Sequence, residues 1–451
     1  MDTISFLVYP TFSHLMATFG IADYFRSSGY KVVYLIPRNL LNLVSDEGFE
    51  AYEFNDLLFA RDNEELSLPK KNFTGYLKAL LSRIDMMIYH KRKKSLTDFY
   101  NRFKPEYFIF DSYLAVDLLL VYNCVNVAQT RFCFVNTMLS PSIFIDKPAL
   151  NSSLNESQLS IIRFDYFFRS FRRIFRRVGV FIRYLGNDNL SLIRLAYKLS
   201  GLPKEHKLLK KRLFSVAISG IPEFILMPSE FDYLSNERRP EEIYVGSKIY
   251  LTRRSECLTF RDIQPRLYEI RRAGMKVILV SFGTLVTDKE GLRIIKPFLL
   301  KLINFISLRP EFALILPANL GKIVNVSGDN RIIQMDFLPQ VLVLPYVDIF
   351  INHGGLNSIK ESLFFNVPML VYPFQDTDAK GNASKVSHRE FGIIGNLKTE
   401  TEILLSKKIS CLLRDSKWVN NIKRFNLNTL YYDQKYFQTK LGAFFPNFRI
   451  Q

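Results

Sequence analysis

The sequence predicts an α/β protein built from two doubly wound domains that face each other across a cleft. Two separate stretches alternate short apolar segments with helical patterns, the first from Ile4 and the second from Lys276. Alternation of this kind is typical of parallel sheets covered by helices. Between the two stretches, residues 232–257 are rich in charged and turn-forming residues, which is typical of a linker.

The first stretch begins with a βαβ pattern. A strand is expected over Ile4–Val8, a helix over His14–Ser27 and a second strand over Lys31–Ile36, which Pro37 ends. Two further segments, Glu106–Phe110 and Arg131–Val135, are short, β-rich and almost continuously apolar. Strands that are buried on both faces have this composition, so both segments are assigned to the same parallel sheet.

The second stretch contains five segments with strand character, separated by helical patterns. The expected strands are Lys276–Ser281, Phe312–Leu316, Arg331–Gln334, Val347–Asn352 and Pro368–Tyr372. This spacing predicts a second doubly wound sheet.

Composition limits the classes of protein that fit. The chain has 451 residues and is 48% hydrophobic, which is enough for more than one core. No stretch is apolar for the roughly 18 residues that span a bilayer, and the start lacks the basic leader of a secretory signal, so a cytoplasmic location is expected. The four cysteines show neither a metal-ligand spacing nor a disulfide framework. The net charge of +18 favours an anionic partner.

The most informative stretch is FINHGGLNSIKESLFFNVPMLVYPFQD, residues 350–376. Its first strand delivers His353, Gly354 and Gly355 to the sheet edge where open α/β folds bind ligands. Glycines let backbone amides approach a ligand, and the first turn of the helix that starts near Asn357 forms an anion site. Asn357 and Ser358 add side-chain donors or cap the helix, and Glu361 lies on the same face as Asn357 and can accept sugar hydroxyls. The pattern therefore predicts a nucleoside diphosphate attached to a sugar, although a tight turn with a capped helix and a solvated Glu361 explains the same spacing.

A longer stretch of this region resembles a known family. Residues 337–383, FLPQVLVLPYVDIFINHGGLNSIKESLFFNVPMLVYPFQDTDAKGNA, resemble the donor-binding signature of the UDP-glycosyltransferases, which include UDP-glucuronosyl and glucosyl transferases and macrolide glycosyltransferases. The resemblance is strong over residues 276–396 and weaker over residues 1–136. It implies the GT-B fold of two Rossmann-like domains, with the last segment of the chain crossing back over the first domain. The expected division is an acceptor domain over residues 1–231, a linker over 232–262, a nucleotide-sugar domain over 263–419 and the returning segment over 420–451.

The same resemblance implies roles for individual residues. Phe337, where the family usually has tryptophan, would stack on uracil, and Gln340 would lie beside the base and ribose. His353, Gly354, Gly355, Asn357 and Ser358 would surround the diphosphate, and Glu361 would accept the ribose hydroxyls. VSFGT, residues 280–284, resembles a loop in which Gly283 and Thr284 approach the same phosphates.

One position departs from the family pattern. An Asp-Gln or Glu-Gln pair usually contacts the sugar, whereas this chain has Asp378 followed by Ala379, in a segment that is one residue longer. Asp376 could take the place of Asp378. An altered sugar preference is therefore expected.

Two residues of the first stretch are candidates for catalysis. His14 follows the first strand, and Asp111 follows the strand that begins at Glu106. Each has an ordinary structural explanation, as a helix-capping histidine and a turn aspartate. In the resembling family, however, a histidine at this point removes the acceptor proton and an aspartate orients it, which suits the pKa of imidazole. The implied reaction is direct displacement with inversion, with no metal and no cofactor beyond the sugar donor.

Residues 161–186 combine phenylalanines with arginines at helical spacing. The apolar stripe includes Phe164, Phe168 and Phe171, and Arg169, Arg172, Arg173 and Arg176 lie mostly on other faces. The pattern fits a helix on an anionic membrane surface, and equally a helix whose stripe packs into the core. No nucleic-acid module accompanies the charge. A hydrophobic or lipid acceptor is the corresponding expectation.

Two other functions stay open on the sequence alone. A nucleotide-sugar epimerase on the same fold would use the donor site without an acceptor, and the presence of both His14 and Asp111 argues against it. A binding protein that has lost transfer is suggested by Ala379, where a sugar-contacting glutamine is usual.

Overall fold

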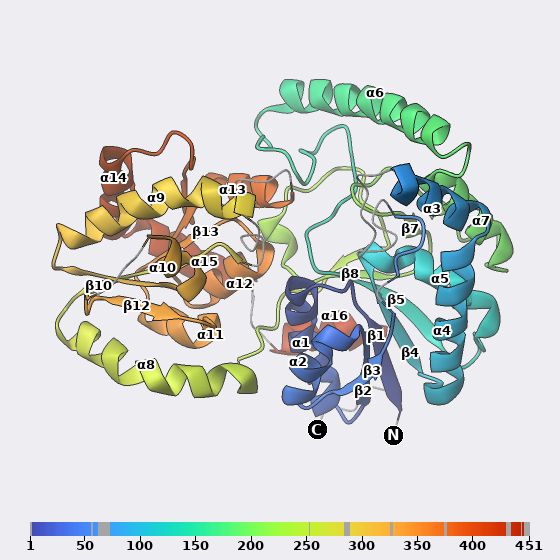
Figure 1. Cartoon of the computed structure of the whole chain (residues 1–451), viewed down its shortest axis with the longest axis horizontal. Coiled ribbons are helices and arrows are strands. Elements are labelled where there is room, and N and C mark those ends of the chain that lie inside the picture. The colour runs from blue at the N-terminus through green and yellow to red at the C-terminus, as the bar shows by residue number, and fades with distance from the viewer. Residues whose placement is uncertain are drawn as a thin grey trace.

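The computed structural model describes residues 2–55, 57–61, 73–251, 253–283, 289–324, 328–373, 377–429, 434–442 and 444–445. Figure 1 shows two α/β bodies side by side, the first in blue to green and the second in yellow to red. The predicted fold class of two doubly wound domains is confirmed.

The first body holds a seven-stranded sheet in which all neighbouring strands run parallel, in the order β3-β2-β1-β4-β5-β8-β9. Its strands are β1 (Thr3–Leu7), β2 (Lys31–Ile36), β3 (Glu50–Glu53), β4 (Tyr107–Asp111), β5 (Arg131–Asn136), β8 (Glu223–Ile225) and β9 (Glu242–Tyr244). Its helices are α1 (Phe12–Ser27), α2 (Leu41–Asp46), α3 (Phe73–Ile84), α4 (Met87–Phe103), α5 (Ala115–Val121), α6 (Leu159–Arg183) and α7 (Asn189–Leu199). A small antiparallel pair, β6 (Leu208–Leu209) and β7 (Ala217–Ile218), lies outside this sheet.

Alternate residues of each strand face opposite layers of helices, as strand geometry requires. Val33 and Leu35 of β2 pack in the core that contains α4 and α5. Tyr34 and Ile36 pack in the opposite core with α1 and α2. Both faces of the sheet are therefore covered, which explains its almost continuous apolar sequences.

The second body holds a six-stranded parallel sheet in the order β12-β11-β10-β13-β14-β15. Its strands are β10 (Lys276–Ser281), β11 (Phe312–Pro317), β12 (Ile332–Met335), β13 (Ile349–Asn352), β14 (Met369–Val371) and β15 (Gly392–Ile394). Its helices are α8 (Arg254–Arg272), α9 (Lys289–Ser307), α10 (Ala318–Val324), α11 (Gln340–Val343), α12 (Leu356–Phe364), α13 (Ala379–His388), α14 (Glu402–Arg414) and α15 (Lys417–Thr429). The five strands expected from the sequence are all present, with ends that differ by at most two residues.

Part of the stretch assigned to the linker belongs instead to the first sheet. β9, residues 242–244, pairs with β8 as the edge strand. The carboxylate of Glu242 accepts hydrogen bonds from Ser140 and Ser142 and pairs with Arg212. The charged residues that suggested a solvated connection therefore form a polar layer that holds the edge strand.

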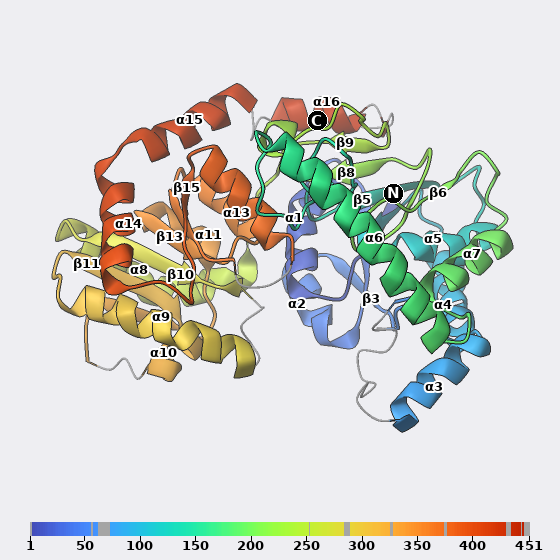
Figure 2. The same cartoon turned by 90° about the horizontal axis from the view of Figure 1, so that it is seen from above.

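The end of the chain returns to the first body. Helix α16 (Gln434–Gly442) places Phe437 and Leu441 in the core beside α1, where the Phe437 ring lies 5.1 Å from that of Tyr24. Figure 2 shows α15 over the second body and α16 beside β9 of the first. The crossing therefore takes place after Thr429.

The two bodies share a buried interface. Met227 and Phe231 of the first body pack with Leu356 and Ile359 of α12, and with Phe425 of α15. Beside this apolar cluster, the buried carboxylate of Asp232 lies 2.8 Å from Lys147 and 3.6 Å from Lys385 of α13. Burial raises the pKa of Asp232, but the two lysines outweigh burial and hold that pKa below its usual value.

Helix α6 corrects one interpretation of the sequence. Its apolar stripe does not pack into the core of this chain, because Ile162 is the one residue of the helix that is buried. The helix lies along the outside of the first body in Figure 1. The side chains of its stripe are exposed.

Candidate functional site

The first half of the site forms where β1, β4 and β5 end at one edge of the sheet. His14 lies in the first turn of α1, and its Nδ1 is 2.7 Å from Oδ2 of Asp111 at the end of β4. The same Nδ1 is 2.9 Å from the hydroxyl of Thr137, which directly follows β5. Contacts at Nδ1 leave the opposite ring nitrogen, Nε2, as the one that can receive a proton. The structure thus brings together the two residues expected to be catalytic, which the sequence separates by 97 positions.

Asp111 is completely buried, and backbone amides fix the orientation of its carboxylate. The amide of Tyr113 donates to Oδ1 at 2.9 Å, and that of Tyr9 donates to Oδ2 at 3.3 Å. Since both amides belong to the loops that follow β4 and β1, the carboxylate is held by the same backbone that presents His14. This is the arrangement that orients a histidine general base.

Aromatic side chains surround the imidazole. The rings of Tyr9 and Tyr113 lie 5.1 and 4.9 Å from the ring of His14, and Phe214 stacks on Tyr113 at 5.8 Å. Burial, followed by the charges of Asp378 and Asp111, raises the pKa of Tyr113, so its phenol stays protonated at neutral pH. Arg61 lies over the same ring at 5.3 Å. These walls make the surroundings of His14 apolar on several sides.

The second half of the site is the turn between β13 and α12. The imidazole of His353 lies between two glycines: a Cβ on Gly283 would come within 2.8 Å of the ring, and one on Gly355 within 2.7 Å. Gly283 also has a φ of 65°, a conformation that side chains rarely adopt. Both positions therefore need glycine because His353 occupies the space. Burial lowers the pKa of His353 to about 4, so this ring is neutral at physiological pH.

Gly354 is fixed against helix α13. Its φ is 92°, and a Cβ there would meet the carbonyl oxygen of Ala379 at 2.8 Å. Asn382 donates from Nδ2 to the carbonyl of Gly354 at 3.0 Å and to the carboxylate of Asp378 at 2.9 Å. The His-Gly-Gly turn and Asp378 thus form one unit, which the Asn-Ala pair of the sequence pattern stabilises.

Asp378 faces the catalytic half of the site. Burial raises the pKa of its carboxyl, and the bond from Asn382 and the charge of His14 offset part of this rise. Asp378 is thus within electrostatic reach of His14. Asp376, the alternative sugar-contacting residue, lies outside the described residues, as does Thr284.

Helix α12 begins one residue earlier than expected, at Leu356, and Gly355 is its N-cap residue without a side-chain cap. Asn357 therefore does not cap the helix. Its Nδ2 donates to the backbone carbonyl of Ser13 at 2.8 Å and so connects α12 to the residue before His14. Ser358 is buried, and its hydroxyl accepts a hydrogen bond from the side-chain Nε2 of Gln340 at 3.4 Å. The free amides of the first turn still provide an anion site.

Glu361 is not a solvated helix residue, because it is buried and has two partners. Its Oε1 forms an ion pair with Arg253, and its Oε2 accepts from Nε2 of Gln340. Gln340 and Glu361 therefore lie side by side, as the expected ribose contacts would. Phe337 is 37% exposed, and its ring meets the edge of Phe12, which begins α1, at 6.4 Å.

Sequence reasoning missed three residues of this arrangement. Tyr113 and Thr137 each follow a strand end by one or two positions, and the convergence of parallel strands at one edge was the signal that could have found them. Arg253 precedes α8, far in sequence from Glu361, and no local pattern indicates it.

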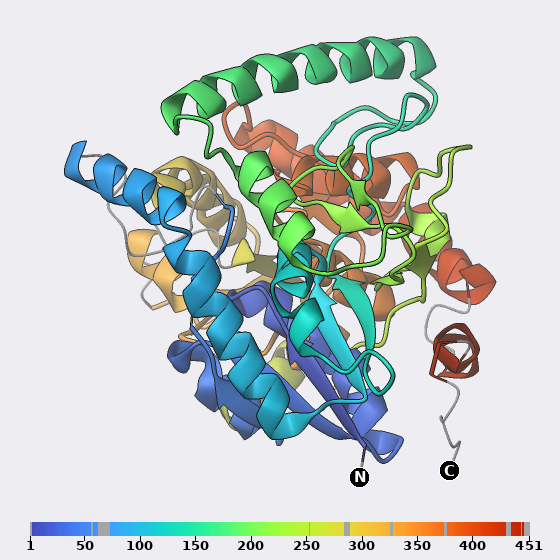
Figure 3. The same cartoon turned by 90° about the vertical axis from the view of Figure 1, so that its right-hand side faces the viewer.

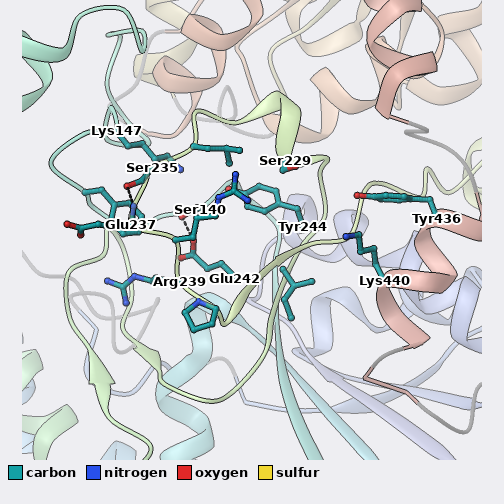
Figure 4. A pocket seen from close by; sticks show the side chains of 15 residues that line it. Ser140, Lys147, Ser229, Ser235, Glu237, Arg239, Glu242, Tyr244, Tyr436 and Lys440 are labelled. Atoms are coloured by element: carbon teal, nitrogen blue, oxygen red, sulfur yellow. Dashed lines mark hydrogen bonds between the residues drawn. The ribbon is translucent and has the colours of Figure 1, made fainter.

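A separate cavity of about 350 Å³ lies between the loop after β5, the segment around β9 and α16. Figure 4 shows charged and aromatic side chains around it, among them Lys147, Arg239, Glu242 and Lys440. None of the site residues expected from the sequence lines it.

Two general properties concern the described residues only. Within them, no group of three or more histidine, cysteine, aspartate or glutamate side chains has the arrangement of a metal site. In the same part of the chain, no helix is both long and apolar enough to cross a membrane.

Comparison with known proteins adds to this geometry. The family model described as UDP-glucoronosyl and UDP-glucosyl transferase matches residues 267–446. Residues 267–446 are thus similar to the UDP-glycosyltransferases. The resemblance seen in the sequence is thereby confirmed for the part of the chain that carries the donor-site pattern.

Individual relatives agree with this assignment. An uncharacterized UDP-glucosyltransferase of Bacillus subtilis (strain 168), YdhE, is 27% identical over 258 residues, which are 53% of this chain and 61% of the relative. The matched region thus spans less than two thirds of that protein.

Solved structures extend the likeness in fold to the whole chain. The glycotransferase of kitacinnamycin has a TM-score of 0.65 at 18% identity and covers 99% of both chains. The glycosyltransferase VinC, solved in complex with DTDP, has a TM-score of 0.60 at 14% identity and covers 98% of both. At these identities the likeness shows the fold, which is the GT-B arrangement expected from the sequence.

Proposed function

We propose that this protein is an inverting glycosyltransferase that moves a hexose from a nucleoside diphosphate sugar, first of all a UDP-sugar, to a hydroxyl of a small hydrophobic or lipid acceptor. The observation that carries the proposal is the His14–Asp111 pair at 2.7 Å, which lies beside the start of α12, because Asn357 of that helix donates to the carbonyl of Ser13 at 2.8 Å. A base close to an anion site is what direct displacement at an anomeric carbon requires.

In the proposed reaction, Nε2 of His14 takes the proton of the acceptor hydroxyl while its oxygen attacks the sugar. Asp111 stabilises the imidazolium that forms, and Thr137 helps to hold the ring in place. The bond from the anomeric carbon to the diphosphate breaks, and the nucleoside diphosphate leaves. The amides of the first turn of α12 stabilise the departing charge.

The donor would lie along the second domain. His353 is neutral, so its contribution to a phosphate would be a hydrogen bond rather than a positive charge. Phe337 is accessible for stacking on a base. Glu361 would have to share its carboxylate between the ribose hydroxyls and Arg253. Asp378, close to both His14 and the turn, is the residue proposed to contact the sugar.

The hydrophobic character of the acceptor is supported by the walls around His14. Tyr9, Tyr113 and Phe214 offer aromatic surface beside the base, and such surface favours an apolar acceptor. A membrane surface, where a lipid acceptor is found, is the proposed location of the reaction. The proposal assigns no metal and no further cofactor, so turnover should persist with a chelator.

The test is release of nucleoside diphosphate from a panel of UDP- and dTDP-sugars, with and without hydrophobic alcohols and lipid acceptors. Both nucleotides belong in the panel because VinC was solved with DTDP. Release should depend on one donor and on the acceptor, and His14→Ala should abolish it. His90→Ala, on the exposed side of α4, is the matched control that should retain it.

Other outcomes would replace the proposal. Isomerised donor without an acceptor would indicate an epimerase. Saturable donor binding with no turnover on any acceptor would indicate a binding protein. Failure to bind any donor would exclude the donor site.

A further inference from the structure

Helix α6 packs on the protein with its polar side and turns its apolar side outward. Arg169 donates to Oδ1 of Asn151 at 2.7 Å, and Arg173 donates to the carbonyl of Arg212 at 3.1 Å. Ile162, two turns before Arg169, is the buried residue. These three positions follow one another at intervals of seven and four residues, so they mark one face of the helix. Arg169 and Arg173 therefore lie on the side of the body, which corrects their expected place on a membrane surface.

The opposite face consists of large apolar side chains that are more than half exposed. Those of the helix are Phe164, Phe167, Phe168, Phe171, Ile174, Phe175, Val178, Phe181 and Ile182, and Leu185 follows shortly after its end. An amphipathic helix of a globular protein ordinarily turns this stripe toward the core. Ten exposed apolar side chains on one side instead indicate a surface that a binding partner covers. In Figure 3, α6 is the outermost helix at the top of the molecule.

Helix α3 continues this surface. Its Phe73 is 77% exposed, and Leu77, Leu81 and Ile84 are also exposed. The hydroxyl of Tyr76 donates to the carbonyl of Arg183, and the rings of Tyr76 and Tyr184 lie 6.1 Å apart. The end of α6 and the start of α3 are thus in contact. We refer to the exposed apolar residues of α3 and α6 together as the outer face.

The charge beside the outer face decides between possible occupants. Helix α6 contains seven arginines and one aspartate. By helical geometry, Arg172, Arg176 and Arg183 flank the apolar stripe on one side, and Arg163 and Arg177 on the other, all of them exposed. Two copies of this face would bring arginines against arginines, whereas anionic headgroups would neutralise them.

We propose that the outer face binds the surface of an anionic lipid bilayer, with its phenylalanines in the boundary between headgroups and acyl chains and its flanking arginines at the phosphates. Aromatic rings on one side and arginines at the edges are the features of helices that lie in a membrane interface. The proposal gives the membrane part of the proposed function a defined face, and it does not depend on the transfer reaction.

The outer face is connected to the donor site through the loop before α6. Ser384 of α13 donates to the carbonyl of Leu154 at 2.9 Å, and the carbonyl of Leu150 lies so close to Gly381 that a Cβ there would approach it to 1.9 Å. Helix α13 begins directly after Asp378. A protein docked through α6 would therefore hold the donor domain at a fixed position relative to the bilayer.

The first experiment is flotation of the full chain with vesicles of phosphatidylcholine, with and without 30% phosphatidylserine. The chain should float with the anionic vesicles and far less with the neutral ones. Phe171→Glu combined with Phe175→Glu should lower the bound fraction at least tenfold. Leu308→Glu combined with Leu427→Glu, at two exposed positions of the second body, is the matched control that should bind as the wild type does.

A second set tests the arginines. Arg172→Gln, Arg176→Gln and Arg183→Gln together should remove most of the preference for anionic lipid. The control triple Lys398→Gln, Lys407→Gln and Arg414→Gln removes as much charge from exposed positions of the second body and should keep the preference. If both triple variants lose the preference for anionic lipid to the same extent, net charge alone explains the binding. That result would overturn the assignment to α6.

A third readout measures depth. The chain has one tryptophan, Trp418, which is buried in the second body. Phe171→Trp should add a fluorescence component that shifts to the blue and is quenched by brominated lipids. No shift on vesicles would overturn insertion of this face. Sedimentation without lipid distinguishes the remaining occupant: a dimer that Phe171→Glu with Phe175→Glu abolishes would assign the face to a second copy and overturn the proposal.

The docking test and the reaction test fail separately. The phenylalanine variant should retain turnover of a water-soluble acceptor, because its residues are remote from His14. Vesicle binding without any donor turnover would leave docking established and the proposed reaction excluded. Turnover without vesicle binding would establish the proposed reaction and exclude docking.

Discussion

His14 and His353 lie at comparable places, each just after a central parallel strand, yet their surroundings differ. His14 is partly exposed, and its Nδ1 meets Asp111 and Thr137. His353 lies between two glycines, and burial lowers its pKa to about 4. The same side chain is therefore equipped to accept a proton in one domain and to remain neutral in the other. Topology places the histidine, and its neighbours decide its chemistry.

The largest expected effect comes from removing the carboxylate of Asp111 that pairs with His14. Asp111→Asn should lower kcat by roughly 10²- to 10⁴-fold, because the amide no longer stabilises the imidazolium or its correct tautomer. The KM for the donor should stay unchanged, since the described hydrogen bonds of Asp111 all go to residues of the first body. Steady-state kinetics with the best donor measure this, with Asp98→Asn on the exposed side of α4 as control. A kcat within threefold of the wild type would contradict a base at His14.

The second effect concerns the neutral histidine. The folded pKa of His353 is about 4, below the 6.5 of an unfolded chain. Between these values the unfolded state binds a proton that the folded state does not, so stability is lost as pH falls from 6.5 toward 4. The loss amounts to at most about 3 kcal/mol. Urea unfolding at several pH values should show a shallower pH dependence for His353→Gln than for the wild type. His90→Gln should leave this pH dependence as it is. If His353→Gln shows the wild-type pH dependence, His353 is not the group whose protonation destabilises the fold.

The third effect tests the space around His353. Gly355→Ala has an ordinary φ, so its added methyl acts only through the approach of 2.7 Å to the imidazole. Displacing the ring should weaken donor binding by about 1–3 kcal/mol, or roughly 5- to 150-fold. Titration calorimetry with the donor measures it. Gly179→Ala, where a Cβ meets nothing within 4 Å, is the matched control. Equal donor affinity in both variants would show that the ring can move without consequence.

The smallest effect distinguishes the two partners of His14. Thr137→Val removes one hydrogen bond to Nδ1 while Asp111 remains, which is worth about 1 kcal/mol, or roughly fivefold in kcat. Thr137→Ser keeps the hydroxyl and should restore the rate. If Thr137→Val keeps the wild-type rate while Thr137→Ser is slow, the methyl group rather than the hydroxyl holds the ring.

The sequence predicted the parts of this structure that depend on local patterns. Four strands of the first sheet, five of the second and the His-Gly-Gly turn follow from apolar periodicity and turn residues, and the convergence of His14 with Asp111 was implied by the resemblance to the family. Contacts made through space were not predictable. Asn357 appeared suited to a cap because nothing in its neighbourhood indicates that Ser13 of the other domain lies beside it.

Two further features could not be predicted for the same reason. The three-residue strand β9 is too short for its periodicity to be detected, and its charges find partners only in the folded chain. The apolar stripe of α6 was correctly identified, but periodicity gives the direction of a stripe relative to the helix and not relative to the protein. Its outward orientation is known only once Arg169 and Arg173 are seen to hold the opposite side.

The buried carboxylate of Asp232 affects how the chain unfolds on heating. It is buried between Lys147 of the first body and Lys385 of the second, and the apolar cluster beside it contains side chains from both bodies. If one body unfolded alone, the other would be left with an exposed apolar surface and an incomplete set of buried charges, and breaking such a set is strongly unfavourable. The two bodies should therefore lose their structure together, in a single calorimetric transition rather than two.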